Sequence, residues 1–102
     1  MVFHTVLFKF KKGTSNDAIA KVMKSIGDLK SVVPGMTSFK WGPYSSSEGL
    51  NRGFGHGFVM TFDNAKSRDT YLTHPAHEKV KAEGLKIIDG GVEGVLAFDF
   101  EA

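Results

Sequence analysis

The chain of 102 residues contains no cysteine, which excludes disulfide bonds, thiolate nucleophiles and cysteine-bound metal. It also lacks any apolar run long enough to cross a bilayer, so membrane insertion is excluded. The net charge is only +2, with acidic and basic residues interspersed, and no broad positive field marks a phosphate-binding surface. With 41% hydrophobic residues, the composition predicts one globular domain with its own core.

The first ten residues, "MVFHTVLFKF", lack the features of a signal peptide. They have no basic lead, no continuous apolar run and no small-residue cleavage site. Apolar and polar residues alternate there instead. We therefore expect a cytoplasmic protein that has no membrane partner.

The segment from Arg52 to Phe62, "RGFGHGFVMTF", approaches the RNP1 signature, in which aromatic residues on a sheet stack against RNA bases. Aligned from its front, the signature places His56 where the second stacking aromatic belongs and Gly57 where a buried valine belongs. Aligned from its back, it loses Arg52 and places Thr61 at the last aromatic position. Neither register fits, so we expect no nucleic acid partner.

Hydrophobic periodicity predicts the order of the elements. Residues 2–10 alternate with period two and are apolar on both faces, which predicts a strand that is covered on both sides. After Ser15, apolar residues recur at steps of three and four until Pro34, which predicts a helix. Further strands are expected over 36–44, 53–62 and 94–100, and helices over 65–72 and 75–88. This order predicts an α+β, ferredoxin-like β-α-β-β-α-β fold with a four-stranded antiparallel sheet, as a single domain over residues 1–102.

The four histidines are the first candidates for a functional site. His4 and His56 lie on the same face of two strands that are central neighbours in this fold. His77 lies in the first turn of a helix that starts at Pro75, on the stripe expected to face the sheet. Three histidines can therefore point into one interior space, whereas His74 is expected to shape the turn before the proline.

Each candidate also has a simpler interpretation. His4 and His56 can be hydrogen-bonded core residues, and Tyr71 is either core or a group that holds a substrate oxygen. For His77 we favour a functional role, because the positive end of a helix disfavours the imidazolium and keeps a general base neutral. Zinc bound by the histidines is a further alternative. Because there is no HExxH motif and no carboxylate clearly joins the cluster, we expect no metal.

Several short motifs together resemble one protein family. They are "HTVLFKF" at the start, "VVPGM" after the first helix, "KWG" in the second strand, "HPAH", and "FDF" near the end. This set is similar to the stress-responsive dimeric α/β-barrel (Dabb) family over nearly the whole chain. The resemblance implies a homodimer in which two sheets pack face to face with the helices outside. The face with Phe3, Thr5 and Leu7 would meet the partner chain, and the face with His4 and His56 would line a cavity.

The resemblance also implies a chemistry, because a plant polyketide cyclase of this family works without metal or cofactor. Its catalytic tyrosine and histidine align with Tyr71 and His77. His77 would remove a proton next to a carbonyl group, and Tyr71 would hydrogen-bond the developing oxyanion. We therefore expect no cofactor and a small hydrophobic carbonyl compound as ligand. The expected substrate-binding residues are His4, Val6, Met23, Ile26, Phe39, His56, Phe58, Met60, Val92 and Val95.

The chain departs from that cyclase at four wall positions. Ile26 and Val92 replace larger aromatic residues, and Phe39 and Phe58 replace valines, so cavity volume moves from one end to the other. A different substrate is therefore expected. The leading hypothesis is a cofactor-independent cyclase, isomerase or lyase; the alternatives are a non-catalytic ligand-binding or stress-responsive dimer and a cofactor-free oxygenase.

The loop over residues 45–51, "SSSEGLN", is rich in serine and glycine and has little to pack. It joins the two strands that carry Phe39 and His56. We expect it to be mobile and to cover the mouth of the cavity.

Overall fold

The computed structural model describes all 102 residues and confirms the predicted ferredoxin-like order of elements. None of its helices is both long and apolar enough to span a membrane. The two helices predicted after the third strand are present as α2 and α3. In chain order the elements are β1 (Val2–Phe8), α1 (Asn16–Gly27), the 3₁₀ turn η1 (Asp28–Ser31), β2 (Met36–Pro43), β3 (His56–Phe62), α2 (Ala65–Thr73), α3 (Pro75–Leu85), the 3₁₀ turn η2 (Gly91–Gly94) and β4 (Val95–Glu101).

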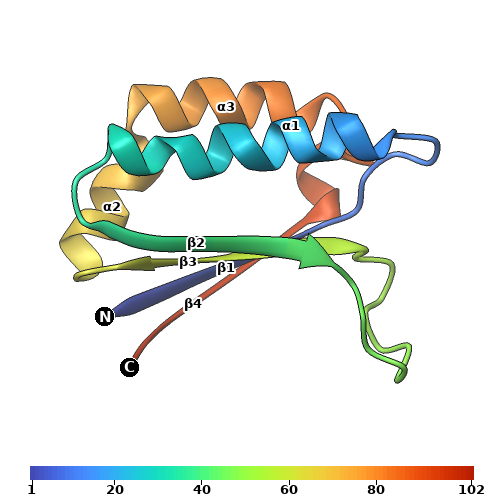
Figure 1. The fold of residues 1–102 in the computed structure, drawn as a ribbon, viewed down its shortest axis with the longest axis horizontal. Helices are drawn as coiled ribbons and strands as arrows, with labels where there is room; N and C mark the ends of the chain where they lie inside the picture. The colour runs from blue at the N-terminus through green and yellow to red at the C-terminus, as the bar shows by residue number, and fades with distance from the viewer.

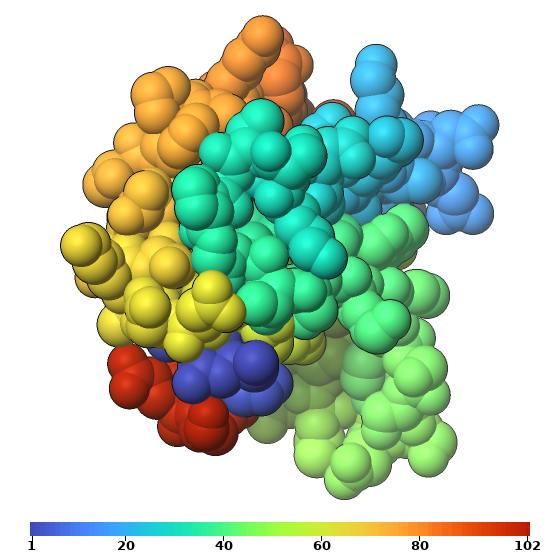
Figure 2. Space-filling view, turned by 60° about the vertical axis from the view of Figure 1, so that its left-hand side comes forward, coloured from blue at the N-terminus to red at the C-terminus, as the bar shows by residue number.

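The four strands form one antiparallel sheet in the order β2-β3-β1-β4. Figure 1 shows α1 and α3 side by side across one face of this sheet, with α2 at one end. No helix covers the opposite face. Both chain termini lie close together at the same end of the sheet (Figures 1 and 2).

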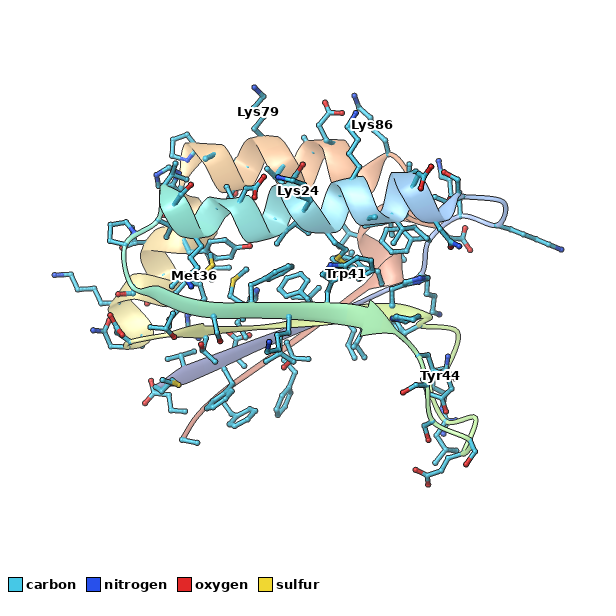
Figure 3. The ribbon with its side chains drawn as sticks, in the orientation of Figure 1. Lys24, Met36, Trp41, Tyr44, Lys79 and Lys86 are labelled. Atoms are coloured by element: carbon cyan, nitrogen blue, oxygen red, sulfur yellow. The ribbon has the colours of Figure 1, made fainter.

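The core lies between the sheet and the helices. β1 alternates buried and half-buried side chains, as the period-two pattern predicts, and its buried residues are Val2, His4, Val6 and Phe8. Figure 3 shows Met36 between the two layers, whereas Lys79 and Lys86 point away from the sheet. The other face of β1, which carries Phe3, Thr5 and Leu7, has no second layer within the chain.

The boundary between α2 and α3 is set by His74 and Pro75. His74 ends α2 in an extended conformation, and its Nδ1 accepts a hydrogen bond of 3.0 Å from the backbone N–H of Ala76. Pro75 occupies the first turn of α3, where its missing N–H would have no partner within the helix. His74 therefore shapes this turn, as expected, and places His77 in the first turn of α3 above the sheet.

The loop between β2 and β3 runs away from the helices. Figure 1 shows it extending from the sheet on the side opposite α1 and α3, and Figure 2 shows it as a projection from the body of the protein. Tyr44, labelled in Figure 3, lies at its start, and the Tyr44 hydroxyl accepts a 2.8 Å hydrogen bond from the N–H of Gly49. The prediction that residues 45–51 cover a cavity under the helices is therefore wrong, because the chain turns toward the uncovered face after β2.

The close packing of Gly94, at the end of η2, against Ile88 and Asp89 predicts a stability difference between two glycine variants. A Cβ atom at the buried Gly94 would overlap the Asp89 carbonyl oxygen and lie 2.7 Å from Cγ2 of Ile88, whereas one at Gly42 would meet nothing within 4 Å. Gly94→Ala should lower the free energy of unfolding by about 2 kcal/mol, a typical result of overpacking. Gly42→Ala, the control, should change it far less. Urea unfolding measures both, and equal stabilities would contradict this packing.

Candidate active site

A cavity of about 410 Å³ lies between the sheet and the helices. It is lined by 17 residues, 13 of them hydrophobic, from the strands below and from α1, α2 and α3 above. The lining residues that carry polar side-chain groups are His4, Tyr71, His77 and Lys81. Apolar walls with a few convergent polar groups are typical of sites that bind small molecules.

The structure brings most of the predicted site residues together around this cavity. Those that line it are His4, Val6, Ile26, Phe58, Tyr71, His77, Val92 and Val95. Met23 and Met60 do not line it, since both are fully enclosed in the core with 0% exposure. Phe39 packs behind the wall, with its ring centroid 5.3 Å from that of Phe58 and its edge against Gly27.

His56 lies outside the cavity, contrary to the expectation that three histidines share one space. It faces the helix side, but it pairs with Phe8 at the far end of β1. Its ring packs edge-on against Phe10, with centroids 5.3 Å apart, and lines a separate hollow beside the β2–β3 loop. Partial burial lowers the pKa of His56. The cavity therefore contains two histidines, His4 and His77.

Tyr71 of α2 and His77 of α3 are direct neighbours, with ring centroids 4.3 Å apart. The Tyr71 side chain is 1% exposed, and its hydroxyl forms no hydrogen bond within the chain. No fully buried side-chain oxygen or nitrogen lacks a partner, so this hydroxyl must open into the cavity that Tyr71 lines. Burial raises the pKa of Tyr71 well above its ordinary value. The phenol therefore stays neutral and can donate a hydrogen bond.

The hydrogen bond of His77 fixes which ring nitrogen is available. Its Nδ1 lies 3.1 Å from the Leu72 carbonyl oxygen, and because a carbonyl only accepts, Nδ1 donates the proton. In the neutral ring, Nε2 then holds the lone pair. Burial is the main cause that lowers the pKa of His77; the Leu72 hydrogen bond offsets this in part, and the charge of Lys81 adds to it. Burial thus favours the neutral ring that was predicted from the helix end.

A carboxylate joins His4, which corrects the expectation that none meets the histidine cluster. The Nδ1 of His4 lies 2.6 Å from Oδ1 of Asp99, and Oδ2 of Asp99 accepts a 2.8 Å hydrogen bond from Nη1 of Arg68. The β1–β4 pairing places His4 directly opposite Asp99. In the sequence, a single aspartate between Phe98 and Phe100 indicates that a carboxylate lies in the last strand. Only the register between β1 and β4 shows that it meets His4. No sequence pattern indicates Arg68.

Lys81 is a further lining residue, outside the set predicted from the sequence. It lies one turn after His77 on α3 and forms an ion pair of 3.3 Å with Glu78. Its side chain is half exposed, and Val92 is 72% exposed, although both line the cavity. The cavity therefore reaches the surface between α3 and η2. No group of three or more histidine, aspartate or glutamate side chains is arranged to hold a metal ion.

Fold and cavity together define a class of protein, a ferredoxin-like α+β domain with an apolar pocket under its helices and one bare sheet face. Residues 2–102 match the model of the stress responsive A/B barrel domain, Dabb. The chain belongs to this family, and the resemblance noted in the sequence is confirmed.

The relatives of the chain include both a stress-response protein and an enzyme. The chain is 33% identical over 100 residues to the stress-response A/B barrel domain-containing protein HS1 of Arabidopsis thaliana, covering 98% of this chain and 88% of that protein. It is 26% identical over 76 residues to olivetolic acid cyclase of Cannabis sativa, covering 74% of this chain and 75% of the cyclase.

Solved structures share the fold closely. A dimeric ferredoxin-like protein of unknown function from Jannaschia sp. CCS1 superposes with a TM-score of 0.88 at 27% identity, covering 99% of this chain and 98% of that one. Hydroxynitrile lyase from Passiflora edulis superposes with a TM-score of 0.83 at 22% identity, covering 97% and 90%. The latter likeness is one of fold alone.

The surroundings of His77 predict its titration. Because burial disfavours the imidazolium, its pKa should lie below the ordinary value of 6.5, with the proton of the neutral ring on Nδ1. ¹H–¹⁵N NMR spectra of histidine side chains recorded across pH would report both properties. Lys81→Met removes a nearby positive charge and should raise this pKa. A wild-type midpoint above 6.5 would contradict the described burial.

Proposed function

We propose that this chain is a cofactor-independent enzyme that removes a proton next to the carbonyl group of a small hydrophobic compound. The supporting observation is the pairing of His77 and Tyr71 in an otherwise apolar wall. The Nε2 atom of His77 and the hydroxyl of Tyr71 both lack protein partners, and their rings lie 4.3 Å apart. Unpaired polar groups among apolar side chains cost free energy, and they are typical of places where a ligand supplies the missing partner.

The two groups divide the reaction between them. Nε2 of His77 takes a proton from the carbon next to the carbonyl group, and the electron pair of the broken C–H bond moves toward the carbonyl oxygen. The Tyr71 hydroxyl donates a hydrogen bond to the negative charge that develops there. Because its pKa is raised, Tyr71 keeps its own proton. The resulting enolate can form a new carbon–carbon bond, regain a proton elsewhere or expel a leaving group.

The cavity also restricts the ligand. Its walls, including Val6, Ile26 and Phe58, favour an apolar body, while Lys81 at the opening offers a cation to an anionic or strongly polar end. The similarity to olivetolic acid cyclase supports a cyclase-type or lyase-type reaction. The similarity to HS1 supports the second candidate, a stress-responsive protein that binds such a ligand without converting it.

We further propose that a second copy of the chain covers the bare sheet face. Phe3 stacks on Phe100 there with ring centroids 5.0 Å apart. Phe98 is 66% exposed on the same face, next to Leu96 and Val59, which are also exposed. A contiguous apolar surface of this kind is typical of protein interfaces. Structural relatives described as dimeric, including the Jannaschia protein, support a twofold pair.

The assembly can be tested by one charge substitution. Phe98→Glu places a carboxylate in the apolar face and should convert the dimer to a monomer, because an unpaired charge in a closed interface is costly. Val32→Glu, at a residue that is 52% exposed after η1 on the helix side, should leave the dimer intact. Sedimentation velocity at micromolar concentration measures both. A monomeric wild-type protein would rule out the dimer.

The chemistry can be tested without knowing the natural substrate. In D₂O, the wild-type protein should speed the exchange of the C2 protons of the N-acetylcysteamine thioester of 3-oxohexanoate, as followed by ¹H NMR. His77→Gln should lower kcat by about a hundredfold or more, and Tyr71→Phe should lower it by a similar order because it removes one oxyanion donor. His56→Gln is the matched control, since this histidine lies outside the cavity.

The same assay separates the two candidate functions. If β-keto thioesters and small unsaturated lactones bind in the cavity but exchange no faster than in buffer, the enzyme proposal fails and the binding protein remains. If His77→Gln exchanges at the wild-type rate, the base is misassigned.

A further inference from the structure

The second histidine of the cavity, His4, presents one free nitrogen to it. Its Nδ1 lies 2.6 Å from Asp99, and because an ionised carboxylate only accepts, Nδ1 carries a proton. Its Nε2 has no protein partner. Since no fully buried side-chain nitrogen is unpaired, this atom must open into the cavity that His4 lines. The His4 ring meets the Tyr71 ring edge-on, with centroids 5.8 Å apart.

The His4 ring is held from three sides. Backbone pairing sets it opposite Asp99, and the rings of Phe58 and Phe62 pack around it at centroid distances of 5.8 and 6.4 Å. Arg68 holds the other carboxylate oxygen of Asp99 at 2.8 Å. A ring fixed by strand register, a carboxylate and aromatic neighbours cannot turn away from the cavity, and such rigid support is typical of groups that act on a ligand.

The charges around the two histidines differ. His4 faces the Asp99 carboxylate, and a carboxylate behind an imidazole stabilises the imidazolium that forms during proton transfer. His77 instead faces the Leu72 carbonyl, with Lys81 nearby and the half-exposed Glu78 carboxylate 3.8 Å away. A positive charge on either histidine disfavours one on the other. A single proton shared by the two rings is therefore best placed on His4, which leaves His77 free to act as the base.

We propose that His4, backed by Asp99 and Arg68, is the acid that complements His77 in the reaction proposed above, on which this inference rests. His77 takes the proton from the carbon, the C–H electron pair forms a carbon–carbon double bond, and the carbonyl oxygen takes the Nε2 proton of His4. The products are an enol, a charged His77 and a neutral His4. Exchange with solvent then resets both rings. Asp99 and Arg68 are positioning residues, because they act on the substrate only through His4.

The split between kcat and KM of exchange tests this division of roles. With the 3-oxohexanoyl thioester, His4→Gln should lower kcat by about a hundredfold with KM little changed, because it removes the acid and leaves the apolar walls that hold the substrate. Asp99→Asn should lower kcat in the same direction, again with KM little changed. In the wild type and in both variants, kcat should still rise with pH as His77 loses its proton.

Asp69→Asn is the matched control for Asp99→Asn. Asp69 accepts a 2.8 Å hydrogen bond from Nε of Arg68, as Asp99 does from Nη1, but it is exposed and does not touch His4. This variant should keep the wild-type kcat and KM. If Asp99 is only structural, Asp99→Asn lowers the melting temperature and leaves kcat of the folded protein at the wild-type value, and the proposal is overturned.

Two further outcomes separate a failure of the His4 role from a failure of the proposed function. A His4→Gln variant with the wild-type kcat overturns the role of His4, while His77 keeps its own. If the wild type does not exchange the probe at all, the proposed function fails first and the role of His4 fails with it.

Discussion

The antiparallel pairing of β1 with both β3 and β4 is the constraint on which the rest of the structure depends. Because β1 is central, its alternate residues are committed to opposite faces of the sheet. On the face under the helices, His4 lies opposite Asp99. On the bare face, Phe3 stacks on Phe100. A slip of one residue would exchange these faces. The register of one strand thus positions both the cavity and the apolar surface.

Within the cavity, one physical cause acts on two groups in opposite directions. Burial lowers the pKa of His77 and raises the pKa of Tyr71, because it penalises the charged form of each. Both therefore remain neutral near pH 7, one as an acceptor and the other as a donor. Asp99 supplies the one carboxylate that is hydrogen-bonded to a cavity histidine, and Arg68 balances its charge. In the proposed reaction, this asymmetry separates the base from the acid.

The sequence predicts the fold well, because alternation in β1 and the proline at the start of α3 are local signals. The period-two pattern correctly places His56 on the helix side of β3. It does not show that His56 lies at the end of the sheet, opposite Phe8, and therefore outside the cavity. The contact of Asp99 with His4 can be predicted only from the register between the first and last strands, which no local pattern gives. The position of Arg68 depends on how α2 packs on the sheet. The direction of the β2–β3 loop after Tyr44 is likewise a tertiary property.

The most direct test of these roles is a crystal structure of the protein with the 3-oxohexanoyl thioester bound. The assignment of His77 as the base and His4 as the acid predicts the thioester inside the cavity, with a carbonyl oxygen about 3 Å from the Tyr71 hydroxyl and from Nε2 of His4, and with C2 next to Nε2 of His77. A ligand seated instead in the groove between α1 and α3, or in the hollow beside His56, with the cavity left vacant, would contradict it.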